Sequence, residues 1–335
     1  MKRKNLVSIS VLGDGGWGTT LSILLAKKGF PVTLWGAFPE YIKILRTKRV
    51  NTKFLPGIKI PPEIQITSNL QEAVADKDLI VLAIPSQYLR GVLKEIKLIR
   101  FSPDTVYLSV VKGIEIGSLK RISELLSEEL GKVPIGVLSG PTIAAEVAAG
   151  VPTAAVVASK SMSVRKLIQD VFMTGRFRLY TSDDVIGVEL GGSLKNVIAI
   201  ACGISDGLGF GSNTKAALLS RGLAEISRLG TAMGARERTF SGISGLGDLV
   251  TTCISPHSRN RFVGEQIGKG KKPAEVLKNL QMVAEGVPTA KSAYILSGKY
   301  KTEMPIVKEV YSVLYKNKSP LKAVKDLMTR AKKEE

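Results

Sequence analysis

The first half of the chain alternates short aliphatic runs with stretches of helical periodicity. Glycine, proline and polar residues bound the aliphatic runs, which predict strands at 6–12, 32–35, 64–67, 79–84, 105–110, 135–140, 154–159 and 177–181. Helical patterns lie between several of them, for example at 19–29 and 118–131. This alternation predicts an α/β fold with a largely parallel sheet.

The pattern changes after Thr181, where long helical periods with glycine and proline punctuation replace the strand-like runs. No flexible linker marks the change. We therefore predict an N-terminal Rossmann-like α/β domain over 1–182 and an all-helical domain over 183–335, packed along a shared cleft.

No apolar run is expected to span a membrane, because Glu146, Gly150 and Pro152 interrupt the longest candidate, 144–159. The basic start of the chain leads into a glycine loop rather than a cleavage site. These features predict a cytoplasmic protein without stable membrane insertion.

Composition narrows the function classes. The 335 residues are 44% hydrophobic and 23% charged, which is typical of a soluble globular protein. Two cysteines and a single histidine, His257, exclude a disulfide framework and a His/Cys metal cluster, so no metal site is expected. The net charge of +19 is compatible with nucleic-acid binding, with a solvated lysine-rich surface or with attraction of an anionic substrate. Because the excess is dispersed and aromatic residues are few, we favour the surface and expect no nucleic-acid partner.

A glycine-rich loop follows the first predicted strand and opens a helix. Gly13, Gly15 and Gly18 form the G-x-G-x-x-G spacing in that context, which predicts dinucleotide binding. The first glycine permits a tight turn, the second lets the backbone approach a pyrophosphate, and the third lets helix and strand pack closely. The N-terminus of the helix then faces the phosphates.

The residues after the second predicted strand leave the choice between NAD and NADP open. An acid that binds the ribose 2′-hydroxyl is expected there, yet the chain has Gly36, Ala37 and Phe38, and no acid before Glu40. Three basic residues that follow either reach a 2′-phosphate or form an ordinary basic helix face: Arg46, Lys48 and Arg49. We expect both NADH and NADPH to be used.

One lysine stands out in an otherwise apolar helical stretch. From Gly187 to Gly203 only Glu189 and Lys195 are charged, and Lys195 shares its helical face with small and aliphatic residues. Since a buried ammonium is costly without a partner, Lys195 either faces a ligand or is satisfied by a group such as Glu189.

Four other segments carry candidate chemistry, each with a purely structural alternative. Lys112 follows the strand at 105–110, where ligands of open parallel sheets bind, or it is an exposed loop lysine. Thr142 follows the turn at Gly140, and Asp248 lies in a glycine-rich loop where aspartates often form turns or caps. The segment 258–260 opens a helix that ends near Gly268 and suits a phosphate, or is simply a capped helix.

In this order and spacing, three segments resemble bacterial NAD(P)-dependent glycerol-3-phosphate dehydrogenases. They are LSGPTIAAEVAAGVPTA, ELGGSLKNVIAIACGISDGLGFGSNTKAAL and GLGDLVTTCISPHSRNR, and the resemblance extends over nearly the whole chain. It implies reversible reduction of dihydroxyacetone phosphate to sn-glycerol 3-phosphate with NADH or NADPH, feeding phospholipid synthesis. A homodimer is a possible assembly.

The resemblance also implies roles for individual residues. Lys195 transfers the proton, and Lys112 acts with it. Substrate contacts fall on Lys112, Gly140, Thr142, Lys195, Asp248, Ser258, Arg259 and Asn260. Cofactor contacts fall on Gly16, Trp17, Lys112, Ala144, Arg259, Val283 and Glu285, in addition to Gly13, Gly15 and Gly18 from the glycine motif and Arg49 from the basic residues after the second strand. The family often has a basic residue where this chain has Ala37, which weakens any claim to strong NADP preference.

Two other functions remain open from the sequence. One is a different hydroxyacid dehydrogenase that joins a Rossmann domain to a helical domain, since GGSLKN is typical of these enzymes too. The other is a non-catalytic dinucleotide-binding protein associated with nucleic acid, as the charge of +19 permits.

Overall fold

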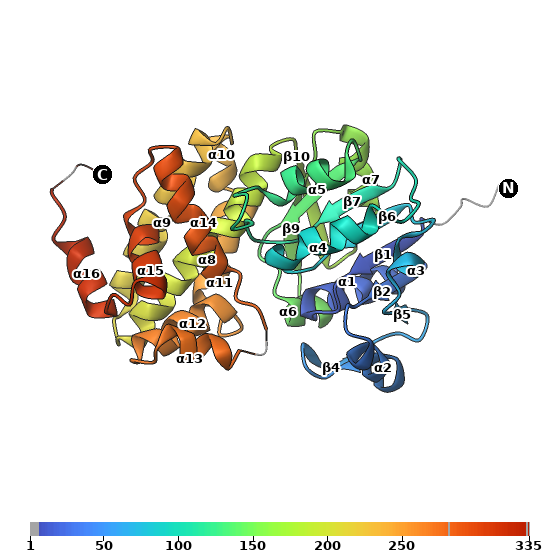
Figure 1. The fold of residues 1–335 in the computed structure, drawn as a ribbon, viewed down its shortest axis with the longest axis horizontal. Helices are drawn as coiled ribbons and strands as arrows, with labels where there is room; N and C mark the ends of the chain where they lie inside the picture. The colour runs from blue at the N-terminus through green and yellow to red at the C-terminus, as the bar shows by residue number, and fades with distance from the viewer. Residues whose placement is uncertain (1–6, 281, 333, 335) are drawn as a thin grey trace. The chain divides into compact units, whose positions relative to one another are not determined.

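The chain folds into two compact units (Figure 1). The computed structural model describes residues 7–280, 282–332 and 334. The first unit comprises Met1–Val111 and Ile122–Val185, and the second comprises Lys112–Arg121 and Ile186–Glu335. The short segment Lys112–Arg121 therefore belongs to the second unit, although the first unit flanks it on both sides in the sequence.

The first unit is built on an eight-stranded sheet in the order β10-β9-β8-β7-β6-β1-β2-β5. All neighbouring strands are parallel except β8 and β9. Every predicted strand is present, and the bounds are β1 Ile9–Leu12, β2 Val32–Trp35, β5 Gln65–Thr67, β6 Leu79–Leu82, β7 Val106–Ser109, β8 Ile135–Ser139, β9 Thr153–Ala158 and β10 Phe177–Ser182. The predicted α/β class with a largely parallel sheet is confirmed.

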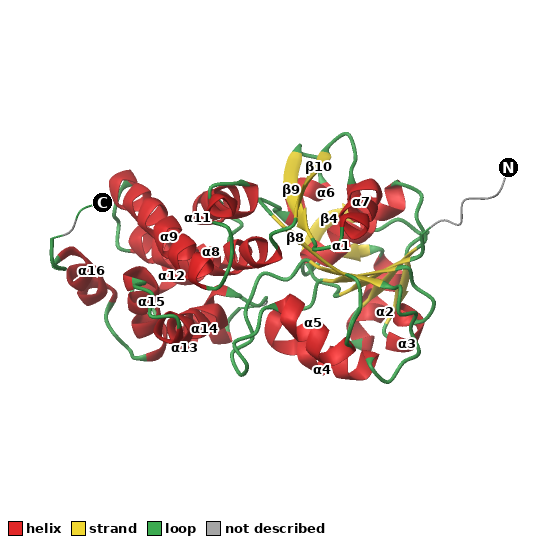
Figure 2. Cartoon of the chain, turned by 90° about the horizontal axis from the view of Figure 1, so that it is seen from above, coloured by secondary structure: helices red, strands yellow, loops and turns green. Residues whose placement is uncertain are grey.

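Helices cover both faces of this sheet, as Figure 2 shows. Along β6, Leu79 and Val81 belong to one apolar cluster while Ile80 and Leu82 belong to another, so successive side chains alternate between the two faces. Burial on both faces explains why the strands are continuous aliphatic runs. The helices are α1 Gly16–Lys27, α2 Pro39–Lys48, α3 Leu70–Val74, α4 Ser86–Ile96, α5 Ile122–Leu130, α6 Ala144–Ala148 and α7 Met162–Phe172.

Two local details differ from the predictions. A small antiparallel pair, β3 Val50–Asn51 with β4 Leu55–Lys59, was not expected, because β4 contains proline and glycine and lacks a clear alternation. The helix predicted over 118–131 begins only at Ile122. Leu119 has a φ of 60°, a left-handed conformation that a regular helix does not accept, and residues 118–121 pack with the second unit.

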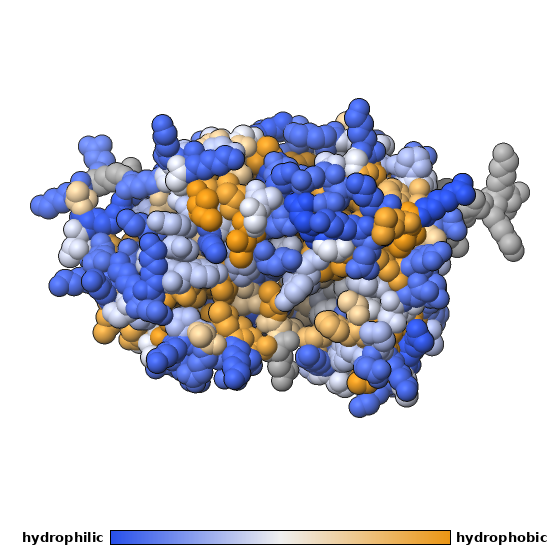
Figure 3. Space-filling view, viewed as in Figure 1, coloured by the Kyte–Doolittle hydropathy of each residue, from blue (hydrophilic) through white to orange (hydrophobic). Residues whose placement is uncertain are grey.

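The second unit is helical and is organised around α8, Val185–Gly207. The other elements are α9 Ser212–Ala232, α10 Glu237–Phe240, the π-helical turn η1 Ile243–Gly247, α11 Asp248–Ile254, α12 Arg259–Gly268, α13 Pro273–Lys278, α14 Gly286–Lys299, α15 Pro305–Tyr315 and α16 Pro320–Met328. The predicted helical C-terminal region is confirmed. Hydrophilic side chains cover much of its surface in Figure 3, and Lys316, Lys322 and Lys325 are among the exposed lysines.

The longest apolar candidate is α8 rather than the predicted stretch 144–159. The helix is long and apolar enough to cross a membrane by length and composition, but 94% of its most apolar window is buried inside the protein. Val197, Ile198 and Ile200 are fully buried in the core of the unit. Helix α8 is therefore apolar because it is surrounded by protein.

Glycines bring α12 close to α8. A Cβ at Gly203 would lie 2.0 Å from the carbonyl oxygen of Arg261, and a Cβ at Gly264 would lie 2.1 Å from that of Ile200. No side chain fits in this contact, because the backbones themselves are in van der Waals contact. The contact continues to the ends of both helices, where a Cβ at Gly268 would lie 2.9 Å from the Cα of Gly207, so α12 packs along the C-terminal half of α8.

We therefore predict that Gly203→Ala lowers the free energy of unfolding by about 2 kcal/mol or more, because the helices must separate to admit the methyl group. Gly298→Ala is the matched control, since a Cβ there meets nothing within 4 Å. That variant should gain up to about 1 kcal/mol from helix propensity. Urea unfolding followed by far-UV circular dichroism measures both. A Gly203→Ala protein as stable as the control would show that the contact is not tight.

Candidate active site

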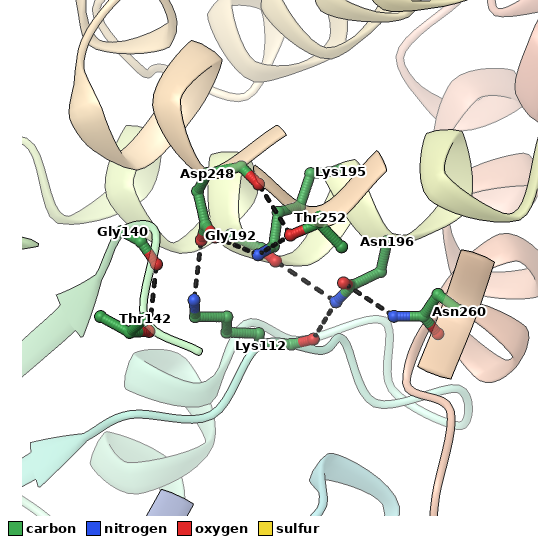
Figure 4. Close-up of polar contacts among 9 residues, drawn as sticks. All are labelled: Lys112, Gly140, Thr142, Gly192, Lys195, Asn196, Asp248, Thr252 and Asn260. Atoms are coloured by element: carbon green, nitrogen blue, oxygen red, sulfur yellow. Dashed lines mark hydrogen bonds and ion pairs between the residues drawn. The ribbon is translucent and has the colours of Figure 1, made fainter. Parts of the chain in front are cut away.

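Lys195 lies in the middle of α8 and is 4% exposed. Its Nζ donates hydrogen bonds to Oδ1 of Asp248 and, over 2.6 Å, to Oγ1 of Thr252 (Figure 4). Asp248 and Thr252 are one turn apart on α11, and so present both acceptors to the same ammonium. The Thr252 hydroxyl in turn donates to the Asp248 carbonyl over 2.7 Å.

Asp248 joins two lysines through one carboxylate. Its Oδ2 lies 2.8 Å from Nζ of Lys112, while Oδ1 accepts from Lys195. The side chains of Asp248 and Lys195 are 2% and 5% exposed, and that of Lys112 is 17% exposed. Asp248 is the first residue of α11, one position after the N-cap Gly247, and its carboxylate serves as the shared partner of two ammonium groups. The Lys112 ammonium is the more accessible of the two.

The glycine-rich turn before α11 explains how Asp248 reaches α8. A Cβ at Gly191 would lie 2.7 Å from the carbonyl oxygen of Ser244, so the turn approaches the helix backbone directly. Glu189, the alternative partner for Lys195, instead forms an ion pair with Arg121, and both side chains are buried. The structure thus assigns separate partners to the two charged residues of the apolar stretch.

Burial lowers the pKa of Lys195 to about 7. Desolvation of the ammonium is the largest cause, Asp248 opposes it by raising the pKa, and Lys112 lowers the pKa further. A lysine with this pKa takes up and releases a proton near neutral pH. The arrangement can therefore perform general acid–base chemistry next to a fixed positive charge.

Two asparagines connect the segments around this cluster. Asn196 Nδ2 donates to the carbonyl oxygen of Lys112 over 3.0 Å, and its Oδ1 accepts from Nδ2 of Asn260 over 2.9 Å. Asn260 Oδ1 accepts from the backbone N–H of Gly286, also over 2.9 Å. The amide of Asn260 thus has a positioning role toward Asn196 and Gly286. Sequence reasoning missed Asn196 and Thr252; the adjacency of Asn196 to Lys195 and the i, i+4 spacing of Thr252 from Asp248 were the available signals.

The predicted helix start at 258–260 is confirmed. Ser258 is the N-cap of α12, and its hydroxyl accepts the backbone N–H of Arg261 over 3.3 Å. Arg259 is exposed, and its Nη1 donates to the carbonyl oxygen of Val283 over 2.8 Å. Glu285 stands immediately before α14. An exposed guanidinium at a helix N-terminus is suited to an anionic group.

In the first unit, the candidates after β8 lie beside the glycine loop. Gly140 has a φ of 146°, and the Thr142 hydroxyl donates to the Gly140 carbonyl oxygen over 3.1 Å. Ala144 begins α6, and its carbonyl oxygen accepts from the hydroxyl of Thr20 on α1 over 3.0 Å. A Cβ at Gly16 would lie 3.7 Å from the Cβ of Ala144. Gly16 and Ala144 are therefore neighbours at the start of α1.

The glycine loop has the geometry of a phosphate cradle. Gly13 has a φ of 123°, and a Cβ at Gly18 would lie 1.9 Å from the Gly13 carbonyl oxygen. In contrast, a Cβ at Gly15 would meet nothing within 4 Å, so open space lies beside this residue at the N-terminus of α1. The indole N–H of Trp17 is buried and has no hydrogen-bond partner among the described residues. These residues fit a bound dinucleotide.

The basic residues after β2 have structural partners. Arg49 Nη1 donates to the carbonyl oxygens of Pro61 and Ile64 over 3.3 Å and 2.7 Å. Arg46 Nε donates to the Ile66 carbonyl oxygen over 2.7 Å. Both guanidinium groups hold the chain that leads into β5, which favours the structural interpretation of these two residues over a 2′-phosphate site.

Known proteins of one enzyme family match this chain along nearly its whole length. Residues 8–165 match the family model for the N-terminus of NAD-dependent glycerol-3-phosphate dehydrogenase, and residues 184–325 match the model for its C-terminus. The glycerol-3-phosphate dehydrogenase [NAD(P)+] of Citrifermentans bemidjiense is 50% identical, covering 98% of each chain. That of a Thermoanaerobacter species is also 50% identical, covering 98% of this chain and 99% of the relative. The crystal structure of glycerol-3-phosphate dehydrogenase from Coxiella burnetii has a TM-score of 0.94 at 37% identity, covering 97% of this chain and 99% of the other.

The charge cluster predicts opposite effects of two substitutions on Lys195. Asp248→Asn removes the carboxylate that raises the pKa of Lys195, so that pKa should fall below about 7. Lys112→Met removes a cation that lowers the pKa of Lys195, so that pKa should rise above about 7. The Nζ resonance in lysine-labelled protein, assigned by its loss in Lys195→Met, reports the titration. Shifts of the same sign in both variants would contradict this description.

Proposed function

Since the chain belongs to the NAD-dependent glycerol-3-phosphate dehydrogenase family, we propose that the Lys195–Asp248–Lys112 cluster carries the chemistry of its reaction. The protein is an NAD(P)-dependent oxidoreductase that interconverts dihydroxyacetone phosphate and sn-glycerol 3-phosphate. Family membership at this identity rules against the two alternatives left open by the sequence, a different hydroxyacid dehydrogenase and a non-catalytic dinucleotide-binding protein.

The observation that carries the proposal is the buried Lys195 with a pKa of about 7. Oxidation of a secondary alcohol requires a base for the hydroxyl proton and positive charge near the developing alkoxide. The bound nicotinamide supplies the hydride acceptor. Lys195 takes the hydroxyl proton, Asp248 holds its ammonium in place, and Lys112 adds the second positive charge. In the reverse direction, Lys195 returns the proton to the carbonyl oxygen.

The phosphate of the substrate is bound, in this proposal, at the N-terminus of α12. Arg259 offers a planar set of donors, and Ser258 and Asn260 flank it at the start of a ten-residue helix. Gly140 and Thr142 complete the substrate contacts proposed from the resemblance. Asn260 acts partly by positioning, because its amide already bonds to Asn196 and Gly286.

Residues 1–182 form the proposed dinucleotide-binding domain, and 183–335 the proposed helical catalytic domain. The cofactor is NAD or NADP. We propose that its pyrophosphate lies over the N-terminus of α1. The proposed contacts are Gly13, Gly15, Gly16, Trp17, Gly18, Lys112, Ala144, Arg259, Val283 and Glu285. Arg49 is a further proposed contact, through Nε and Nη2, because its Nη1 donates to the carbonyl oxygens of Pro61 and Ile64.

The cellular role follows from the reaction. The product, sn-glycerol 3-phosphate, is the starting material of glycerophospholipid synthesis, and we propose that the protein supplies it in the cytoplasm. We further propose a homodimer, with neither nucleic acid nor a membrane as a partner. The charge of +19 then serves solubility and attraction of the anionic substrate.

The first test is Lys195→Met, which should reduce kcat by about 10²–10⁴-fold while the affinity for NADH changes little, because a general acid–base group contributes on that scale. Turnover is followed by nicotinamide absorbance with dihydroxyacetone phosphate, and binding by nicotinamide fluorescence. A variant that keeps more than about a tenth of the wild-type kcat would show that another group transfers the proton.

The second test concerns the phosphate. A charge-assisted hydrogen bond contributes about 1.5–3 kcal/mol, and a forked pair of them reaches the upper end or beyond, so Arg259→Ala should lower kcat/KM for dihydroxyacetone phosphate about a hundredfold or more. Arg259→Lys should lose nearly as much, because lysine lacks the planar fork. Unphosphorylated dihydroxyacetone should be a poor substrate that the substitution hardly affects. Equal losses for the two substrates would mean that Arg259 holds the cofactor or the fold instead.

A further inference from the structure

The carboxylate of Asp14 lies at the end of β2, although Asp14 itself belongs to the glycine loop after β1. The loop is attached to that end, since the backbone N–H of Gly13 donates to the carbonyl oxygen of Trp35 over 2.9 Å. A Cβ at Gly36, the residue after β2, would lie 2.6 Å from Cγ and from Oδ2 of Asp14. The Asp14 carboxylate therefore fills the space that a side chain at position 36 would occupy.

The position of the Asp14 carboxylate explains why no acid follows β2 in the sequence. In dinucleotide-binding folds, an acid at the end of the second strand binds the 2′-hydroxyl of the adenine-side ribose. Here that place has glycine, and the exposed Ala37 and Phe38 follow. Glycine at position 36 leaves this space to the carboxylate of Asp14, which a side chain there would displace. A carboxylate is therefore present at the end of β2, but it belongs to Asp14 of the glycine loop.

The Asp14 carboxylate is also incompletely satisfied. Its Oδ2 is buried and has no hydrogen-bond partner within the described part of the chain. The main chain of Asp14 is held in place, because its carbonyl oxygen accepts from Nδ2 of Asn51 over 2.8 Å. Burial raises the pKa of Asp14, and the nearby Lys53 lowers it to a smaller extent. A carboxylate with one buried oxygen that lacks a donor is costly, and a ligand hydroxyl that donates to its other oxygen would offset part of that cost.

We propose that Asp14 accepts a hydrogen bond from the ribose 2′-hydroxyl of the cofactor and thereby makes the enzyme prefer NAD to NADP, an inference that rests on the proposed function. The residue is only half-buried, and rotation about its Cβ–Cγ bond exchanges the two oxygens. A 2′-phosphate offers negative charge in place of the hydroxyl donor and is repelled by the carboxylate. The Arg46 and Arg49 guanidinium groups donate to backbone carbonyls rather than standing ready to neutralise that phosphate.

The test measures binding in the absence of the second substrate. Dissociation constants of NADH and NADPH are obtained by nicotinamide fluorescence, and those of ADP-ribose and its 2′-phosphate by calorimetry. A hydrogen bond to a charged group corresponds to a preference of about tenfold to a hundredfold, so wild type should bind NADH more tightly by that factor. Asp14→Ala should weaken NADH binding by about tenfold or more without weakening NADPH binding. Asp14→Asn keeps an acceptor but loses the charge, and should chiefly strengthen NADPH binding.

Glu40→Gln is the matched control, because Glu40 is the first acid after β2 and its side chain is exposed. It should keep the wild-type ratio of the two dissociation constants. Retained NADPH binding in the Asp14 variants shows that their glycine loop is folded. An unchanged ratio in both Asp14 variants, or a ratio that moves with Glu40→Gln, overturns the inference. Nucleotide binding with the expected ratio but no turnover of dihydroxyacetone phosphate would refute the proposed reaction alone.

Discussion

One carboxylate shared between two ammonium groups is the interaction on which the helical unit depends. Lys195 cannot be buried in an apolar helix without a partner, and Asp248 is that partner. Desolvation of the buried ammonium lowers the pKa of Lys195 to about 7, because Asp248 offsets it only in part and Lys112, which pairs with the same carboxylate, lowers the pKa further. With its pKa near 7, Lys195 carries a proton that can be exchanged at neutral pH.

Close backbone approaches make this charge cluster possible. Gly191 admits the turn that carries Asp248, and Gly203 and Gly264 admit α12, whose first residues include Arg259. Asn196 then connects Lys112 to α12 through Asn260. The same principle operates in the first unit, where Gly36 makes room for the carboxylate of Asp14. In each case a residue without a side chain lets a charged group from elsewhere occupy a defined position.

The local pattern of apolar and polar residues was sufficient to predict much of the fold. The sheet strands could be predicted because both faces of the sheet are covered, which makes each strand a continuous aliphatic run between breakers. The start of α12 could be predicted because Ser258 caps it within three residues. The β3–β4 pair could not, since its strands are short and contain proline and glycine. The late start of α5 depends on Leu119 and on packing with the second unit, which local periodicity does not report.

By itself the sequence determined the α/β class, the helical C-terminal region, the glycine loop and, through family resemblance, the choice of Lys195, Lys112 and Asp248 as candidates. Only the tertiary structure decided that Glu189 pairs with Arg121 and leaves Lys195 to Asp248. It also placed Asp14 where an acid of the second strand was expected. The physical reason is that strands, caps and turns arise from interactions between near neighbours, whereas a pKa or a ligand contact depends on charges brought together from distant segments.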